Sequence, residues 1–240
     1  MKLFEITSKD IKFSVEYHDT LNPKLWDGDK LQPEVREKLL TIANAFQDYL
    51  SIPNLTVEDI VITGSNANFN WTEHSDVDLH LIVNLDKLKK VPKEIVPDLL
   101  KAKRTLWADE HDITLKGMPV EVYAQDDREP HVSSGVFSVK SNKWIKEPTH
   151  EIPTVNDSAV KVKAADLINQ IDKILSGKRN PSLVDKFKKK LVKLRKAGLA
   201  KAGEFSTENL VFKILRDKGY IDKATKYEQD AINAELSMDK

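Results

Sequence analysis

The sequence predicts an α/β domain followed by an α-helical domain, and three patterns support this prediction. Short apolar runs bounded by turn residues are typical of strands, and they occur at 59–63, 77–85 and 113–124. Apolar residues at helical spacing fill 33–50, ahead of these runs. Beyond residue 158 helical spacing dominates. We therefore place an α/β domain at 1–150 and a helical, basic domain at 151–240.

The first domain begins with a predicted strand and a predicted helix. Residues 11–17 alternate apolar and polar side chains, which is typical of a half-buried strand. From Pro33 to Leu50 the apolar residues recur at helical spacing, with one proline in the first turn and Pro53 beyond the end. This helix precedes the predicted strand at 59–63.

The rest of the first domain alternates strands with one helix. An apolar strand at 77–85 is followed by a helical segment at 92–110. Two further strands, 113–116 and 119–124, flank Lys116-Gly117-Met118, and glycine in a short connection favours a hairpin. We expect a second hairpin within 135–145 that turns at Ser141-Asn142.

The boundary between the domains is placed at 147–157, a segment with two prolines and no periodic pattern. Beyond it Asn180 favours a helix start as a cap, and Gly203 and Gly219 mark breaks. The spacing predicts helices at 158–175, 181–199, 207–217 and 221–236.

Composition excludes several function classes. The 240-residue chain contains no cysteine, so a disulfide framework, a thiolate zinc site and a cysteine nucleophile are impossible within it. Its N-terminus is too polar for a signal peptide, and no apolar run approaches the roughly 20 residues of a membrane helix. We therefore expect a cytoplasmic protein without membrane contact; the sequence makes no prediction of its oligomeric state.

Charge is distributed unevenly along the chain. Residues 1–130 contain 24 acidic and 16 basic residues, whereas residues 131–240 contain 14 acidic and 22 basic ones. Within 178–203 ten lysines and arginines accompany a single acid, Asp185. Such a segment indicates a polyanionic partner such as RNA, or a solvated lysine-rich helix face that complements the acidic first domain. The sequence leaves both interpretations open.

Asp76 and Asp78 indicate a metal site. Alternate residues of a strand point to the same face, so these two carboxylates lie together while Val77 and Leu79 point the other way. Adjacent carboxylates repel each other unless a cation neutralises them. Carboxylate oxygens combined with substrate phosphates suit Mg²⁺ or Mn²⁺. The pair therefore predicts half of a metal site for phosphoryl or nucleotidyl transfer.

A longer motif contains this pair. Gly64-Ser65, ten intervening residues and then Asp76-x-Asp78 before an apolar strand resemble the signature of the nucleotidyltransferase superfamily that includes DNA polymerase β, and its minimal members in particular. The resemblance implies a small mixed-sheet fold in which Gly64 and Ser65 begin a short helix that binds the nucleotide phosphates. Orphan backbone amides at a helix start favour such anions. The whole chain also resembles proteins of tailed phages, which implies a host cytoplasm.

The same resemblance implies a third carboxylate on a neighbouring strand. We assign it to Glu121, which lies between Val120 and Val122 and would be out of place there unless it faced a site. The implied reaction is attack of a substrate hydroxyl on the α-phosphate of ATP or another NTP, with Mg²⁺ or Mn²⁺ held by Asp76, Asp78 and Glu121. One carboxylate could receive the hydroxyl proton.

The acceptor of the nucleotide is left open. The basic segment favours an RNA end such as a tRNA 3′ terminus; a protein side-chain hydroxyl ranks next and a small molecule third. A non-catalytic nucleotide- or RNA-binding module and a virion-associated structural protein are the alternatives to an enzyme. The sequence also leaves open whether His80 serves the site or the core, and whether Phe69 and Trp71 stack on a base or on the protein.

Overall fold

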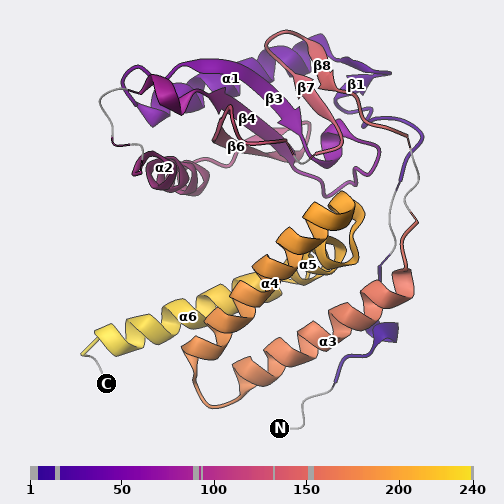
Figure 1. Ribbon diagram of the computed structural model, residues 1–240, viewed down its shortest axis with the longest axis vertical. Helices are drawn as coiled ribbons and strands as arrows, with labels where there is room; N and C mark the ends of the chain where they lie inside the picture. Colours follow the sequence, from indigo (N-terminus) through magenta and orange to yellow (C-terminus); the bar gives the residue numbers. More distant parts are fainter. Residues whose placement is uncertain are drawn as a thin grey trace. The chain divides into compact units, whose positions relative to one another are not determined.

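The computed structural model describes residues 5–13, 17–88, 92, 94–131, 133–150 and 154–238. The chain divides into two compact units (Figure 1): one spans Glu16–Ile152, and the other combines Met1–Val15 with Pro153–Lys240. The first unit mixes helices with a sheet and the second is helical, which confirms the predicted α/β class with a helical C-terminal part.

A six-stranded mixed sheet forms the centre of the first unit. Its strand order is β5-β6-β4-β3-β7-β8, with β4 and β6 parallel and every other neighbouring pair antiparallel. The strands are β3 (Val57–Thr63), β4 (Val77–Val83), β5 (Thr114–Leu115), β6 (Met118–Asp126), β7 (Val136–Ser138) and β8 (Lys143–Lys146). Both predicted hairpins, β5–β6 and β7–β8, are confirmed. A separate small hairpin precedes them, formed by β1 (Trp26–Asp27) and β2 (Lys30–Leu31).

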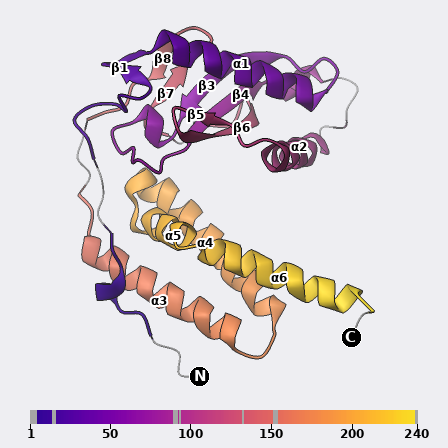
Figure 2. The same cartoon turned by 180° about the vertical axis from the view of Figure 1, so that it is seen from behind.

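Two helices share a core with one face of this sheet. Helix α1 (Pro33–Leu50) has the predicted bounds and buries the residues of its apolar stripe, while α2 (Val96–Glu110) contributes Trp107 to the same core. Figure 2 shows both helices beside the sheet. The alternating residues of β4 that join this core are Val77, Leu79, Leu81 and Val83. The opposite face of β4 therefore carries Asp78 and His80.

In the part of the second unit that the structure describes, four α-helices share a core of their own. They are α3 (Asp157–Ser176), α4 (Pro181–Ala202), α5 (Thr207–Asp217) and α6 (Tyr220–Leu236), so all four predicted helices are confirmed within three residues at each end. The side chains of Asn156, Asn180 and Ser206 accept backbone hydrogen bonds at the starts of α3, α4 and α5. These caps satisfy amides that would otherwise lack a partner.

The N-terminal segment corrects two predictions. Residues 11–13 and 17 are not in a strand, and residues 14–16 of the predicted strand lie outside the described residues. The chain up to Val15 also groups with the helical unit, whereas the sequence placed all of 1–150 in the first domain. Ile11 is buried in the helical core, and the backbone of Ile6 exchanges hydrogen bonds of 2.8 and 2.7 Å with the Asn169 side chain. Ile11 and Phe13 thus pack on helices instead of pairing in a sheet.

Two element bounds also differ from prediction. Strand β4 ends at Val83, because Asn84 accepts a hydrogen bond from the Lys87 amide and turns Leu85–Lys87 into a short 3₁₀ helix. Helix α2 begins at Val96, with Pro97 in its first turn, instead of at residue 92. A proline is tolerated in the first turn because the amide that it lacks would have no partner within the helix there.

Candidate metal and nucleotide site

The three predicted carboxylates converge on one face of the sheet. Asp78 of β4 lies directly opposite Glu121 of β6 in the parallel register, and Asp76 immediately precedes β4. One carboxylate oxygen of each residue lies within 4.8 Å of the other two. Asp76 and Asp78 are half-buried, whereas Glu121 is exposed, so the cluster is open to solvent.

This donor set fits a divalent cation. Three anionic oxygen atoms within 4.8 Å of one another match the hard ligands that Mg²⁺ and Mn²⁺ prefer. Mg²⁺ usually retains water or substrate oxygens beside one or two protein carboxylates, and the solvent-facing side of this cluster leaves room for them. The residues thus fit the cofactor that the motif implies.

Position 64, next to the carboxylate cluster, requires glycine for two physical reasons. Its backbone φ of +74° combined with a ψ of −159° belongs to a region that side-chain-bearing residues essentially avoid. A β-carbon at this position would lie only 2.0 Å from the Asp78 carboxylate oxygen Oδ2. Thr63, the preceding residue, pairs with Asp78 across the sheet, so the end of β3 brings the Gly64-Ser65 turn to the predicted metal ligand.

The turn continues into a 3₁₀ helix of three residues, Ser65–Ala67. The Ser65 hydroxyl donates a 2.8 Å hydrogen bond to the hydroxyl oxygen of Ser75, the residue before Asp76. The side-chain amide of the buried Asn66 donates a 2.7 Å hydrogen bond to the backbone carbonyl oxygen of Asp76. The indole of Trp26 in turn donates to the Asn66 carbonyl oxygen. These bonds tie the Gly-Ser turn to the start of β4.

The segment 133–135 packs on this turn, and sequence reasoning missed it. The Gly64 amide donates a 3.1 Å hydrogen bond to the Ser133 hydroxyl. At Gly135 a β-carbon would lie 1.8 Å from the Ala67 carbonyl oxygen, so only glycine permits this approach. The run Ser133-Ser134-Gly135 before β7 was the available signal, but nothing in its spacing connects it to residue 64.

His80 lies on the same face as the carboxylates but is engaged by the protein. One ring nitrogen, Nε2, lies 3.0 Å from the Thr63 hydroxyl, and the other, Nδ1, lies 2.6 Å from the Gln125 side-chain oxygen. Burial lowers the pKa of His80 to about 4, which the Gln125 hydrogen bond only partly offsets. A neutral imidazole with both nitrogens bonded supports the core interpretation.

This low pKa predicts acid sensitivity. Because the folded pKa of about 4 lies below the ordinary 6.5, the unfolded chain binds a proton first. His80 therefore contributes its full stability above pH 6.5, and this contribution is lost as pH falls toward 4. At pH 5 the loss is roughly 2 kcal/mol of unfolding free energy.

Urea unfolding of wild type and His80→Asn between pH 7 and 4.5 measures this effect. The unfolding free energy should fall less steeply with pH in the variant. The exposed His74→Asn is the control, and equal slopes in all three proteins would contradict the assignment.

Arg104 is a further neighbour of the cluster that the sequence did not reveal. Its Nη2 lies 2.8 Å from the Glu121 carboxylate oxygen Oε2, and its guanidinium lies 4.6 Å from the centroid of the Tyr123 ring. The Tyr123 ring contacts His80 at a centroid distance of 3.9 Å. Burial and the Asp78 charge raise the pKa of the Tyr123 phenol. Arg104 comes from α2, so only the packing of that helix beside β6 brings it to Glu121.

The aromatic residues of the loop before β4 contact protein rings. Trp71 stacks on His18 with ring centroids 3.7 Å apart, and its indole nitrogen donates to the Thr20 carbonyl oxygen. Phe69 meets the His150 ring edge-on at 4.7 Å. The structure thus gives both rings internal partners, and base stacking by either ring stays an untested prediction.

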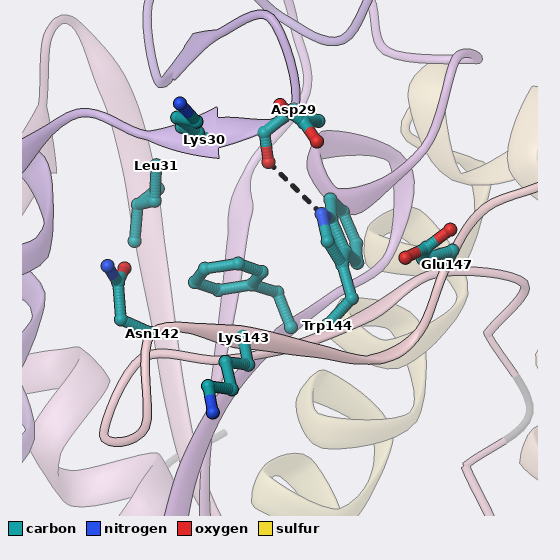
Figure 3. Close-up of a pocket in the computed structure, with 8 residues that line it drawn as sticks. Asp29, Lys30, Leu31, Asn142, Lys143, Trp144 and Glu147 are labelled. Atoms are coloured by element: carbon teal, nitrogen blue, oxygen red, sulfur yellow. Dashed lines mark hydrogen bonds between the residues drawn. The ribbon is translucent and has the colours of Figure 1, made fainter.

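A cavity of about 310 Å³ lies elsewhere in the first unit (Figure 3). The β1–β2 hairpin and the β7–β8 hairpin line it, and the Trp144 indole donates a 3.1 Å hydrogen bond to the Asp29 carbonyl oxygen across it. Phe137, which also lines it, belongs to the core on the helix-covered face of the sheet. The carboxylates occupy the opposite face, so this cavity is separate from the candidate site.

The basic segment presents part of its charge to solvent. Four exposed lysines recur along α4 at spacings of three and four residues, which places them on one stripe: Lys186, Lys189, Lys193 and Lys196. Lys189 contacts Asp185 on the same helix. Other basic side chains have partners within the unit, because Lys188 pairs with Glu228 and Arg195 donates to Asn209 and packs over Phe212.

Comparison of the chain with protein-family models, with curated proteins and with solved structures found no match in any of the three. Among the residues that the structure describes, no helix combines the length and apolar character needed to cross a membrane.

Proposed function

We propose that the protein is a Mg²⁺- or Mn²⁺-dependent nucleotidyltransferase with a nucleotidyltransferase-type fold in its first unit. The main support is the convergence of Asp76, Asp78 and Glu121 within 4.8 Å of one another, next to the Gly64-Ser65 turn. An acidic cluster alone has many explanations. The combination with a glycine that packs directly on one of the acids, in the order of the superfamily motif, favours this one.

In the proposed reaction an acceptor hydroxyl oxygen forms a bond to the α-phosphorus of an NTP. The bond from the α-phosphorus to the bridging oxygen breaks, and pyrophosphate leaves. A carboxylate of the cluster accepts the hydroxyl proton. The Ser65 hydroxyl and neighbouring backbone amides hold the departing phosphates. When bound, one or two divalent cations stabilise the charge on the attacking and leaving oxygens.

RNA is the acceptor that the helical unit favours. The first and last lysines of the stripe Lys186, Lys189, Lys193 and Lys196 are ten residues apart, or about 15 Å along the helix. Regularly spaced exposed ammonium groups bind phosphate backbones without reading sequence. A protein hydroxyl is the second candidate acceptor, and a binding module without catalysis is the alternative function.

The stripe makes a specific prediction for RNA binding. Replacing its four lysines with alanine should weaken RNA binding at least tenfold for every RNA sequence tested. The slope of log affinity against log salt concentration should become less steep by about 2 to 3, since about 0.7 counterion is released per phosphate contacted. Fluorescence anisotropy over a salt series measures both quantities.

The control removes lysines elsewhere in the helical unit, at Lys161, Lys218 and Lys226. Its RNA affinity should stay within about twofold of wild type. Equal affinities for the stripe variant and wild type, or an affinity that is independent of salt, would contradict an RNA interface on α4.

Transfer itself is tested with the full chain, each of the four NTPs labelled at the α-phosphate, and Mg²⁺ or Mn²⁺. Total RNA and total protein are offered as separate acceptors. Label in RNA supports the favoured acceptor and label in protein supports the second. Nucleotide binding without transfer to any acceptor would favour the binding module.

A further inference from the structure

Arg104 contacts the candidate site, but the proposed reaction gives it no role. Its guanidinium forms a 2.8 Å ion pair with Glu121, the most exposed carboxylate of the cluster. Arginine and a divalent cation are both attracted to the same carboxylate, and they repel each other. A cation that uses Glu121 as its third ligand must therefore displace or weaken this ion pair.

The ion pair is also of the kind that breaks readily. The Arg104 and Glu121 side chains are 44% and 46% exposed, and solvent-exposed ion pairs contribute little to stability. Water and salt compete for both partners at such exposure. Breaking this pair upon cation binding thus costs less than it would in a buried site.

Arg104 has other contacts that survive the loss of Glu121. Its guanidinium lies over the Tyr123 ring, and a cation over an aromatic face is favourable in itself. Arg104 and Tyr123 both line a cavity of about 170 Å³ that Glu129 also lines. The guanidinium of Arg104 therefore has space beside the Tyr123 ring, and Glu129 offers it an alternative anionic neighbour.

We propose that Arg104 is an exchangeable counter-ion of Glu121: it holds the third carboxylate while the site lacks a cation and releases it when a cation binds. This inference rests on the proposed function. Arg104 lowers the repulsion among the three carboxylates of the empty cluster and lowers the affinity for a free cation. A cation that arrives with nucleotide phosphates brings additional ligands and overcomes this competition, which couples metal binding to nucleotide binding.

The test is Mn²⁺ binding to the full chain without nucleotide, measured by calorimetry. Arg104→Met keeps an apolar stem over the Tyr123 ring but removes the charge, so Mn²⁺ should bind about five- to twentyfold more tightly than to wild type. Arg104→Lys retains the charge and should stay close to wild type. Lys103→Ala removes a charge from the same helix turn, where Lys103 contacts Tyr49 of α1, and should leave Mn²⁺ affinity unchanged.

A double variant ties the effect to Glu121. In the Glu121→Gln background, Arg104→Met should increase Mn²⁺ affinity much less than in the wild-type background, because the contested carboxylate is gone and only the direct repulsion between the two cations remains.

The outcomes separate this role from the proposed function. If wild type binds Mn²⁺ and Arg104→Met binds it equally or more weakly, Arg104 only orients Glu121 as a supporting residue, and the counter-ion role is wrong. If no variant binds Mn²⁺ without nucleotide, the counter-ion role is wrong, whereas the proposed function is contradicted only if the chain also fails to bind any NTP together with Mn²⁺.

Discussion

Replacing Asp78 with asparagine is expected to reduce the proposed nucleotidyl transfer at least a thousandfold while leaving the fold intact. Asp78 lies at the centre of the site: it pairs with Thr63 on one side and Glu121 on the other, and its carboxylate lies against Gly64. Asparagine keeps the shape but loses the anionic oxygen that holds a cation, and with it much of the stabilisation of transition-state charge.

The stability of Asp78→Asn distinguishes a functional loss from misfolding. Removing one of three clustered carboxylates relieves repulsion, so the melting temperature without metal should stay unchanged or rise. Asp112→Asn removes the same charge from the loop between α2 and β5 and should retain transfer. Transfer rates and melting curves of the three proteins measure this prediction; full transfer activity in Asp78→Asn would show that the acid is not catalytic.

The second large effect is expected from Gly64→Ala. The backbone at Gly64 lies in the region that costs a residue with a side chain about 1–3 kcal/mol, and the new methyl group would overlap the Asp78 carboxylate. We expect a total loss of about 2–4 kcal/mol of unfolding free energy, because the overlap adds to the backbone cost. Displacement of Asp78 should also abolish metal-dependent nucleotide binding.

Gly28→Ala provides the matched control for this variant. Gly28 also has a positive φ, of +61°, but a β-carbon there meets no atom within 4 Å. Gly28→Ala should therefore lower the unfolding free energy through its backbone conformation without loss of nucleotide binding. Urea unfolding and nucleotide titration of both variants measure the two effects. If Gly64→Ala binds nucleotide as well as Gly28→Ala does, the packing of Gly64 on Asp78 has no functional role.

Local patterns predicted the elements that carry the carboxylates. Alternation placed Asp76 and Asp78 on one face, and the structure buries Val77 and Leu79 on the other. Glu121 between two valines was predicted to be a strand residue that faces a site, and the register brings it beside Asp78. These predictions succeeded because side-chain direction in a strand follows directly from sequence position.

The remaining site residues depend on tertiary packing that sequence spacing does not encode. Arg104 reaches Glu121 only because α2 lies beside β6, and Ser133 reaches Gly64 across 69 residues of chain. The alternation of residues 11–17 suggested a strand because Ile11 and Phe13 face an apolar surface. That surface belongs to the helical unit and not to the sheet. Periodicity detects burial without identifying the partner.

The most direct test of the central claim is the melting temperature of the full chain with each NTP and Mg²⁺, Mn²⁺ or a chelator, in wild type and in the variant Asp76→Asn/Asp78→Asn. A ligand that binds only the folded state stabilises it, and at a hundredfold excess over its dissociation constant the melting temperature should rise by about 5 °C. We predict a rise in wild type that requires a divalent cation, differs among the four NTPs and disappears in the variant. No rise under any condition, or an equal rise with chelator and in the variant, would contradict a metal-dependent nucleotide site.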